Sequence, residues 1–486
     1  MKTELAIVGA GPAGLAATKV ALAHDVSVTV IDEQRAAGGQ FLRQPPAEFR
    51  VSNWLRGGAY DAGKSLLRDV EGQAGVNWMM QTTVAGILRS ADPGNGFELV
   101  IDHSAPRADC AKTASNKLSL KADTVLLAPG CFDLPALFPG WNLPGVMAGG
   151  GIQAFVKSQQ FVPGQRFLFA GSHPLQLIIA DQIIQAGGEV AGVLFCQSKA
   201  RVMALLREPS VVLRNWGKFA ETLRVLKRLR KAGVPVKFSQ TLVAANGVSQ
   251  LESVTIAPVD SSGTIQKAVT EQVECDRLGV CFSFVASSEL ARQAGAACHW
   301  DAHLGGFLAE ADLTQQSSIE GLYLAGEITG VAGSGVAALE GQIAGYYLMA
   351  HLGRISREQA EAKVSSICRQ YQHALEFSRV LARLSWPGHE LLNQLMTPSV
   401  TLCKCEEVTV GEVTNALQEN PHITTASAAK LITRVGMGLC QGRYCELGLT
   451  RLIADQRGIP ETSLGGFTAR FPSKPMAIDQ LISDDS

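Results

Sequence analysis

Four cysteines near the carboxyl end of the 486-residue chain have the types and spacing of ligands for a metal or a cluster. Cys403 and Cys405 lie in "CKCEEVT", and Cys440 and Cys445 lie in "GMGLCQGRYC", with 34 residues between the two pairs. Two short helices are expected in that interval and a third after Cys445. A [2Fe-2S] cluster needs two sulfur ligands on each iron, so four thiolates gathered by a small helical unit suit it.

A structural zinc ion is the main alternative for these four cysteines. Zinc also takes four thiolates, but its usual knuckles have Cys-x2-Cys spacing. Cys-x-Cys followed by a long helical spacer favours an iron-sulfur cluster. Glycines 436, 438 and 442 would let backbone amides approach the inorganic sulfides. Four cysteines within 43 positions, beside these glycines, are hard to explain by core packing alone.

A glycine-rich turn near the amino end predicts a dinucleotide site. In "LAIVGAGPAGLAA" a strand pattern precedes the turn and a helix pattern follows it, which is the context that such a fingerprint requires. Gly9 permits the tight turn, Gly11 lets a pyrophosphate approach the backbone, and Gly14 lets helix and strand pack closely. Pro12 and Ala13 complete the turn, where free amides and the positive helix end receive the phosphates.

An acidic residue should follow the second strand and bind the ribose hydroxyls. "VSVTVIDEQ" offers Asp32 and Glu33, and the spacing from Gly9 favours Asp32 without deciding between them. In the following "GGQ", Gly39 and Gln40 resemble the turn that passes beside the flavin in two-dinucleotide-binding flavoproteins.

Two later stretches favour a flavin over a nicotinamide. "ADTVLLAPGCFDLP" contains Pro129 and Gly130 and resembles the segment that crosses between the two domains of such flavoproteins. "GLYLAGEITGVAGSGVAALEGQIAG" resembles the second FAD motif, in which an acid holds the ribityl chain. Gly326 and Glu327 occupy that position, where the family usually has Asp. Val84 is a further candidate cofactor contact.

The strand-turn-helix-strand pattern recurs from Arg166 in "QRFLFAGSHPLQLIIADQIIQAGGEVAGVLF". Here His173 replaces the glycine at which the pyrophosphate would approach, and Gln176 replaces the packing glycine. No clear ribose acid follows. We therefore expect an inherited fold that no longer binds NAD(P), although a different adenine nucleotide could still lodge there. His173 itself is interpreted as a turn residue.

Composition excludes several other classes of protein. Apolar residues make up 46% of the chain and charged residues 18%, with a net charge of -1, which predicts a globular protein without nucleic acid as a partner. No segment reads as a membrane span or a signal peptide. We expect a cytoplasmic protein, and peripheral association with the inner membrane is also compatible with the sequence.

The basic helix in "NWGKFAETLRVLKRLRKAGV" is interpreted as a solvated amphipathic face, with a docking surface for an acidic partner as the alternative.

The motifs together carry a family resemblance. "CKCEEVT", "LITRVGMGLCQGRYC" and "VGAGPAG…DEQRAAGGQ" are similar to the larger electron-transfer subunits of heteromeric bacterial dye-linked dehydrogenases. That family includes opine oxidase A subunits, D-hydroxyproline dehydrogenase alpha subunits and the B subunit of hydrogen cyanide synthase. The cysteine module is similar to bacterioferritin-associated ferredoxin (BFD).

The resemblance implies an α/β fold: a two-dinucleotide-binding-domain, disulfide-reductase-like flavoprotein with a small all-α BFD-like [2Fe-2S] domain. The four cysteines would be the cluster ligands. The expected units are a split FAD-type domain at 1–155 plus 280–354, an inserted Rossmann-like domain at 156–279, a helical linker at 355–398, the BFD-like domain at 399–460 and a tail at 461–486. FAD, or another adenine dinucleotide or nucleotide, would occupy the first domain.

In this family a separate FAD-containing, D-amino-acid-oxidase-like beta subunit oxidises the amine or imino acid. An FMN can sit at the subunit junction, and a small ferredoxin-like gamma subunit can join. The sequence therefore predicts an electron-transfer subunit of an opine oxidase or D-hydroxyproline dehydrogenase type. It contains no identified acid-base pair or nucleophile. The alternatives are a self-sufficient NAD(P)H-dependent FAD/[2Fe-2S] reductase and a zinc-stabilised scaffold.

The seven other cysteines do not change this interpretation. No Cys-x-x-Cys lies beside either nucleotide unit, so the chain is not expected to be a dithiol-disulfide reductase of the thioredoxin reductase kind. Isolated cysteines are common in protein interiors. The seven stand singly at Cys110, Cys131, Cys196, Cys275, Cys281, Cys298 and Cys368.

Overall fold

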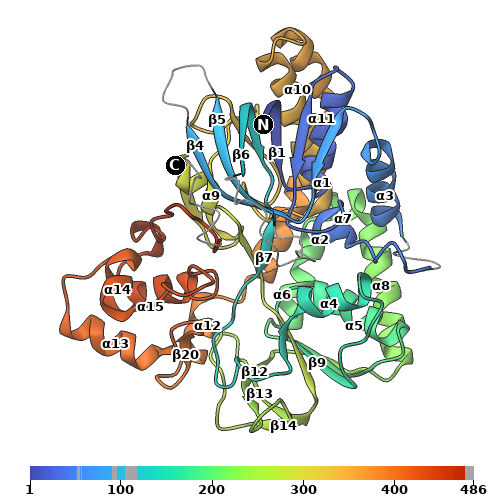
Figure 1. Ribbon diagram of the computed structural model, residues 1–486. Coiled ribbons are helices and arrows are strands. Elements are labelled where there is room, and N and C mark those ends of the chain that lie inside the picture. The colour runs from blue at the N-terminus through green and yellow to red at the C-terminus, as the bar shows by residue number, and fades with distance from the viewer. Residues whose placement is uncertain (52–54, 56, 90–95, 104–117, 477–486) are drawn as a thin grey trace.

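The computed structural model describes residues 1–51, 55, 57–89, 96–103 and 118–476. Cys110 and the predicted tail residues 477–486 lie outside the described residues. The described chain forms a dinucleotide-binding domain, a second α/β domain and a small, mostly helical domain. Figure 1 shows them at the top, at the bottom and at the lower left.

The first domain is built on a seven-stranded sheet of order β3-β2-β1-β6-β5-β4, with β19 also paired to β6. Its parallel strands are apolar and largely buried, as expected where helices cover both faces of a sheet. Strands β4 and β5 add an antiparallel edge. The strands are β1 (Lys2–Val8), β2 (Val28–Ile31), β3 (Val76–Met79), β4 (Thr82–Arg89), β5 (Phe97–His103), β6 (Leu118–Leu127) and β19 (Leu322–Leu324).

This first sheet is completed by chain from two distant parts of the sequence. Strand β19 returns to pair in parallel with β6 after the whole second domain has been traversed. Helix α10 then packs along α1, with Gly341 so close that a Cβ there would lie 2.0 Å from the Ala13 carbonyl oxygen. The helices of this domain are α1 (Pro12–Leu22), α2 (Gly39–Leu42), α3 (Gly58–Val70), α9 (Glu289–Gln293) and α10 (Ser334–His351).

Two antiparallel strands, β7 (Cys131–Asp133) and β16 (Phe284–Ala286), carry the chain out of the first domain and back. Between them lies a parallel sheet of order β11-β10-β9-β15-β8, beside a three-stranded meander β12-β13-β14. The strands are β8 (Val146–Ala148), β9 (Arg166–Gly171), β10 (Glu189–Phe195), β11 (Val236–Phe238), β12 (Gln240–Asn246), β13 (Ser253–Pro258), β14 (Glu271–Glu274) and β15 (Arg277–Cys281). The helices are α4 (Gly149–Lys157), α5 (Leu175–Gln185), α6 (Lys199–Met203), α7 (Pro209–Arg214) and α8 (Trp216–Lys231).

The basic helix α8 is packed by one face. Val225 and Leu229 are buried, and the Arg228 guanidinium forms a two-pronged ion pair with Asp181 on α5, at 2.7 and 2.6 Å. This arrangement fits the interpretation as an amphipathic helix. Docking of an acidic partner on its outer face stays a prediction.

The carboxyl-terminal third begins with two helices in the segment predicted as a linker, α11 (Arg357–Ser385) and α12 (His389–Leu395). The cysteine domain follows. It differs from the all-α expectation by a short antiparallel ladder, because Cys-x-Cys bends the chain back on itself between β20 and β21. Its elements are β20 (Thr401–Cys403), β21 (Val408–Thr409), α13 (Val410–Glu419), α14 (Ala426–Thr433) and α15 (Glu446–Arg457).

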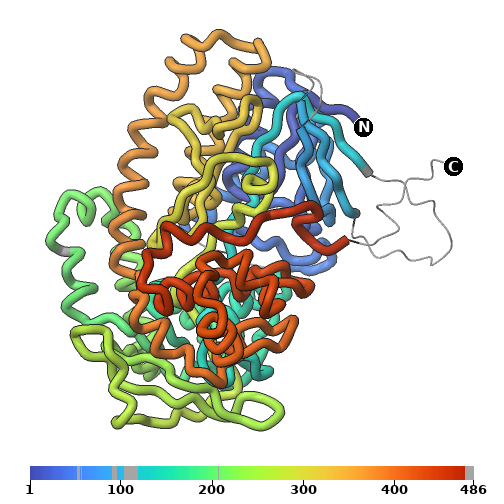
Figure 2. The backbone as a smooth tube through the Cα atoms, turned by 90° about the vertical axis from the view of Figure 1, so that its left-hand side faces the viewer, coloured from blue at the N-terminus to red at the C-terminus, as the bar shows by residue number. Residues whose placement is uncertain are grey.

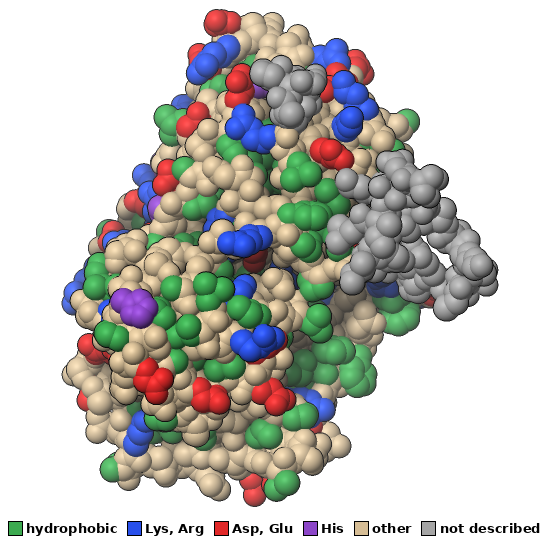
Figure 3. All heavy atoms as spheres, turned by 60° about the vertical axis from the view of Figure 1, so that its left-hand side comes forward, with side chains coloured by type: hydrophobic (Ala, Val, Ile, Leu, Met, Phe, Trp, Pro, Cys, Tyr) green, Lys and Arg blue, Asp and Glu red, His purple; other side chains and the backbone are tan. Residues whose placement is uncertain are grey.

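The last described residues return from the cysteine domain to the first sheet. Figure 2 shows this stretch in dark red between the two. On the face in Figure 3, basic and acidic side chains are interspersed rather than gathered by sign, as the net charge of -1 suggests. Within the described ranges, no helix has both the length and the apolar character needed to cross a bilayer.

Candidate cofactor sites

The first glycine turn lies between β1 and α1, and its three glycines have different reasons to be glycine. A Cβ on Gly9, whose φ is 106°, would lie 2.1 Å from the Ala128 carbonyl oxygen. A Cβ on Gly14 would lie 1.9 Å from the Gly9 carbonyl oxygen. Around Gly11, by contrast, the nearest such atom is the Gly39 Cα at 4.0 Å. The protein's own packing requires the outer two glycines, and Gly11 leaves room for a ligand.

The start of α1 has the properties of a phosphate site. Gly11 is the N-cap residue and has no side chain that could bind the first helix amides, and Pro12 occupies the first helical turn. The first amides of a helix have no partner within the helix, and its positive end attracts anions. The open space at Gly11 therefore fits the pyrophosphate of an adenine dinucleotide.

The structure separates the two candidate ribose acids. The Asp32 carboxylate faces the glycine turn, where it accepts hydrogen bonds from the amides of Ala10 and Gln34, both at 2.7 Å. Burial raises the pKa of Asp32, and these amide bonds oppose the shift. Glu33 instead forms an ion pair with Lys474 of the C-terminal segment. The geometry thus favours Asp32 as the ribose ligand, which stays a prediction.

The other predicted contacts of the first domain meet around the same turn. A Cβ on Gly39 would lie 2.8 Å from the Gly11 Cα, so these two backbones nearly touch. The Gln40 side-chain amide donates to the carbonyl oxygen of Cys131, at 2.7 Å, directly after Pro129 and Gly130. Sequence segments about ninety residues apart are therefore joined at the point where the flavin was predicted.

Val84 lies on β4, close to the strand end that carries Asp32. The Thr82 amide donates to the Asp32 carbonyl oxygen at 2.9 Å, which ties the start of β4 to the end of β2. Val84 is buried and pairs with Ile101, and the ladder then shifts by one residue before Gly86. This bulge leaves Ala85 as the extra residue on β4.

The second FAD-like motif contains two carboxylates, of which Glu340 is buried and Glu327 is half-buried. The Glu327 carboxylate accepts hydrogen bonds from the amides of Ala332 and Gly333, at 2.8 and 3.0 Å, in the loop directly before α10. The Gly326 amide donates to Glu340, at 2.7 Å. Burial raises the pKa of both glutamates to about 7. Glu327 holds its own loop, so its contact to a ribityl chain stays a prediction.

Other titratable groups at the junction of the two domains were not anticipated from the sequence. Asp133 accepts a hydrogen bond from the Gly150 amide at 3.0 Å, and burial raises its pKa. The Lys157 ammonium donates to the Phe41 carbonyl oxygen, at 3.1 Å, and burial lowers its pKa to about 7. Both depend on contacts between the domains, for which a single sequence carries no local signal.

The second glycine-like turn is filled by its own side chains. The His173 side chain is half-buried. Its Nδ1 accepts from the Leu175 amide at 3.2 Å and its ring packs edge-on against Phe284. Burial lowers the pKa of His173 to about 4, so the ring is neutral at pH 7. Gln176 is fully buried, and among the described residues its amide group has no hydrogen-bond partner.

The four predicted cluster cysteines meet in two pairs. The Cys403 and Cys445 thiols are in hydrogen-bonding contact, as are those of Cys405 and Cys440. The two pairs lie near each other, because Cys405 also interacts electrostatically with Cys403, and Cys445 with Cys440. Four thiols gathered in this way suit a two-iron cluster, in which each iron takes two thiolates.

Backbone amides surround the inner pair. The Cys445 thiol contributes most to lowering the pKa of Cys403, to about 5, and the amides of Gly436, Glu406 and Cys405, which also donate to the Cys403 sulfur, lower it further. A thiolate is the form that iron binds. A Cβ on Gly438 would lie 2.2 Å from the Cys405 Cβ. Only glycine therefore fits at position 438, because the two loops approach each other so closely.

The two thiol pairs differ in their access to solvent. Cys403 and Cys445 are buried, at 1% and 0% exposure, whereas Cys405 is exposed and Cys440 half-buried. Leu439, beside the outer pair, is 78% exposed. A cluster held here would therefore have two buried ligands and two ligands nearer the surface.

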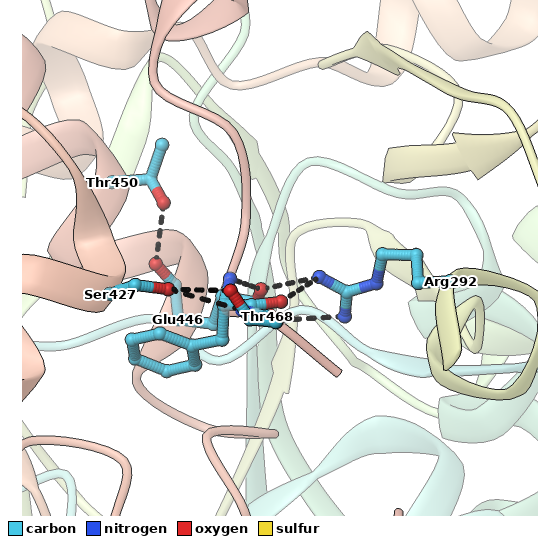
Figure 4. A network of polar contacts seen from close by, with 6 residues as sticks. Arg292, Ser427, Glu446, Thr450 and Thr468 are labelled. Carbon is cyan, nitrogen blue, oxygen red and sulfur yellow. Dashed lines mark hydrogen bonds and ion pairs between the residues drawn. The ribbon is translucent and has the colours of Figure 1, made fainter. Parts of the chain in front are cut away.

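The cysteine domain is held to the first domain by a buried ion pair. The Arg292 guanidinium contacts both carboxylate oxygens of Glu446, at 2.7 and 3.3 Å, and also donates to the Phe467 carbonyl oxygen. The Phe467 amide in turn donates to Glu446, at 2.6 Å. Figure 4 shows these groups converging, with Ser427 and Thr468 alongside. Glu446 directly follows Cys445, so this ion pair fixes the cluster loop.

We expect Arg292→Ala to destabilise the cysteine domain by about 3 kcal/mol, because it leaves Glu446 partly buried without its counter-ion. The Arg292 and Glu446 side chains are each only 14% exposed. The urea midpoint for loss of visible cluster absorbance measures the effect. In the exposed pair Arg357–Glu361, Arg357→Ala is the control and should change stability by less than about 1 kcal/mol. Equal midpoints for the two variants would contradict the prediction.

Comparison with known proteins identifies the class. Residues 3–344 match the family described as pyridine nucleotide-disulphide oxidoreductase, and the chain belongs to this family. Residues 401–455 match the BFD-like [2Fe-2S] binding domain. The predicted fold class and both cofactors, an FAD-type nucleotide and a [2Fe-2S] cluster, are thereby confirmed.

The relatives are components of oxidoreductases. The chain is 30% identical over 484 residues to hydrogen cyanide synthase subunit HcnB of Pseudomonas aeruginosa, covering 98% of this chain and 97% of that one. It is 28% identical over 480 residues to the opine oxidase A subunit of Rhizobium meliloti, with the same coverage. The chain is an oxidoreductase subunit of this group, as the cysteine and glycine motifs indicated.

Solved structures support the fold. L-proline dehydrogenase from P. horikoshii superimposes with a TM-score of 0.68 at 18% identity, covering 99% of this chain and 80% of that one. Thioredoxin reductase of Lactococcus lactis, which covers 73% of this chain, gives a TM-score of 0.50 at 14% identity.

Proposed function

We propose that this chain is the electron-transfer subunit of a heteromeric, flavin-dependent dehydrogenase that oxidises an amine or imino acid, of the opine oxidase or D-hydroxyproline dehydrogenase type. A D-amino-acid-oxidase-like FAD subunit would remove the hydride from a C–H bond next to nitrogen. An FMN at the junction and a third, ferredoxin-like subunit are compatible additions. The final acceptor would be respiratory or artificial.

The observation that carries this proposal is the combination of two cofactor sites with a blocked third one. The Gly11 turn and the two cysteine pairs are both built for redox cofactors. At the turn that would bind NAD(P)H, His173 replaces a glycine, and its half-buried ring packs edge-on against Phe284. The chain thus has the parts to carry electrons and lacks an open nicotinamide turn among its described residues.

The names of the relatives support a partner subunit. HcnB and the opine oxidase A subunit are each one part of a larger enzyme by name. The alpha subunit of sarcosine oxidase from Corynebacterium is 24% identical over 335 residues, which cover 68% of this chain and 30% of that one. Opines and sarcosine are amines, so a substrate with a C–H bond next to nitrogen follows from the shared chemistry.

Within this proposal the residues of the chain have separate tasks. The amides at Gly11 and the start of α1 bind the pyrophosphate, and Asp32 orients the ribose. The cysteine pairs bind iron, while the amides around Cys403 favour its thiolate form. A bound flavin accepts two electrons together and releases them singly, and a [2Fe-2S] cluster carries one.

The main alternative is a self-sufficient NAD(P)H-dependent reductase, which mixing experiments under argon distinguish. We expect NADH and NADPH to leave the flavin absorbance near 450 nm unchanged over minutes, because His173 fills the second turn. Dithionite should bleach it and so serves as the control for a reducible flavin. Rapid bleaching by NADH would contradict the proposal, and a colourless protein containing zinc and no iron would favour a scaffold.

Co-purification with a D-amino-acid-oxidase-like subunit tests the proposed partner. Addition of opines, D-hydroxyproline, proline or glycine to that complex, as reductants of its flavin, then tests the substrate class.

A further inference from the structure

The C-terminal segment, residues 464–476, connects the cluster loop to the nucleotide site. It leaves the cysteine domain after α15 and runs between that domain and the first sheet (Figure 2), and its Lys474 meets Glu33, which follows β2. Nothing in the glycine fingerprint or the cysteine motifs requires such a segment. Its contacts at both ends indicate what it does.

At its first end the segment packs on the cluster loop. Phe467 is buried, and Cβ atoms placed on Gly436 and Gly442 would each lie 2.5 Å from its ring. The Phe467 amide is held by Glu446, and the Thr468 amide donates to the Ser427 hydroxyl at 3.1 Å. Both glycines flanking the cysteines therefore leave room for this one aromatic ring.

At its second end the segment docks on the bulge of β4. The Ser473 amide and hydroxyl both donate to the Ala85 carbonyl oxygen, at 2.7 and 2.9 Å. The Phe471 ring lies over Gly86, where a Cβ would be 2.4 Å from it. Ala85, at the bulge, thus provides the accepting carbonyl oxygen, and Gly86 leaves room for the Phe471 ring. These two residues directly follow Val84.

The segment then places a cation beside the two acids that follow β2. The Lys474 ammonium forms an ion pair with Glu33 and lies close enough to Asp32 to interact with it electrostatically. The Lys474 side chain is 27% exposed. Without this lysine, Glu33 would lose its ion pair and Asp32 would keep only its electrostatic interaction with Arg43, beside the site that receives an anionic pyrophosphate.

We propose that residues 471–476 form part of the adenine-dinucleotide site, with Lys474 as a positioning residue that compensates Glu33 and leaves Asp32 to bind the ribose. Docking of the segment and retention of the dinucleotide then strengthen each other to the same extent, as linked equilibria require. The inference rests on the adenine-dinucleotide site of the proposed function and adds residues that lie outside its fingerprint.

The first test measures how fast FAD leaves the full-length holoprotein after dilution, from the rise in flavin fluorescence. We expect Lys474→Ala to release FAD about tenfold faster than the wild type, which corresponds to about 1.4 kcal/mol. Lys474→Arg should restore slow release, because it keeps the charge. Lys227→Ala, which removes an exposed lysine of α8, is the matched control. Iron content should be unchanged in all three variants.

Release from Lys474→Ala at the wild-type rate would overturn this inference and leave the proposed function intact. A wild-type chain that carries iron but no adenine nucleotide would overturn the dinucleotide site itself, and the proposed function with it. Cysteine-domain unfolding is separated from both outcomes because the cluster absorbance reports it directly.

The second test uses trypsin on the full chain, with FAD bound or stripped. Arg470 is exposed and precedes the docked part of the segment, whereas the bond after Lys474 precedes proline and resists trypsin. We expect bound FAD to slow cleavage after Arg470 several-fold, because docking and binding are coupled. Equal cleavage rates with and without FAD would contradict the coupling.

Discussion

Cys440→Ser should yield a protein that keeps its FAD and its amino-terminal fold but loses most of its iron and its visible cluster absorbance. Cys440 belongs to the outer thiol pair with Cys405, so its loss leaves one iron with a single cysteine. Mutation of residues that only hydrogen-bond to a metal ligand typically lowers metal affinity by about 10–100-fold, and removal of a ligand itself should lower it more. Iron analysis and visible circular dichroism measure the result.

The matched control is Cys368→Ser, which changes a half-buried cysteine of α11. It should retain both iron and FAD at wild-type levels. Full cluster absorbance in Cys440→Ser would refute the assignment of this ligand. Loss of FAD together with iron would instead mean that the two domains do not fold independently of the cluster.

Gly11→Val should give a folded chain that retains iron and binds no FAD. Gly11 has φ -76° and ψ -174°, an extended conformation that valine adopts without strain. A Cβ there would meet no atom nearer than 4.0 Å, so the first atom of the side chain fits without a clash. That space is where the pyrophosphate must approach, and the valine would occupy it. Flavin content and thermal unfolding of the purified variant measure both consequences.

Two further substitutions make the Gly11 test specific. Gly217→Val places the same side chain at another position with nothing within 4 Å, at the start of α8, and should retain FAD. Gly14→Val should fail to fold, because its Cβ would collide with the Gly9 carbonyl oxygen. A Gly11→Val protein with normal flavin content would refute the placement of the pyrophosphate.

Local patterns were sufficient to predict the fold class and both cofactors. The strand-glycine-helix order at Gly9 and Gly14 reflects close contacts within one supersecondary unit, so it can be read from a short stretch. The same holds for the cysteine spacing, since Cys403 and Cys405 are brought to one turn by the single residue between them. The short β20–β21 ladder escaped prediction because it spans too few residues to show an alternating pattern.

Contacts between distant segments could not be predicted in this way. Lys474 meets Glu33 across 441 positions, and Arg292 meets Glu446 across 154, with no periodic signal at either partner. The choice between Asp32 and Glu33 depended on such a contact and stayed open in the sequence. Glu340 offered a weak signal, as a lone carboxylate in an apolar helix, which indicates a buried hydrogen-bond partner.

The return of β19 to the first sheet has a consequence for synthesis on the ribosome. The second domain is nearly continuous, from β8 at Val146 to β15 at Cys281, and can fold as soon as it emerges. The first sheet must wait for β19 and α10, which end at His351. We therefore expect the later-encoded domain to fold first, while the earlier strands remain exposed to chaperones until 351 of the 486 residues have been made.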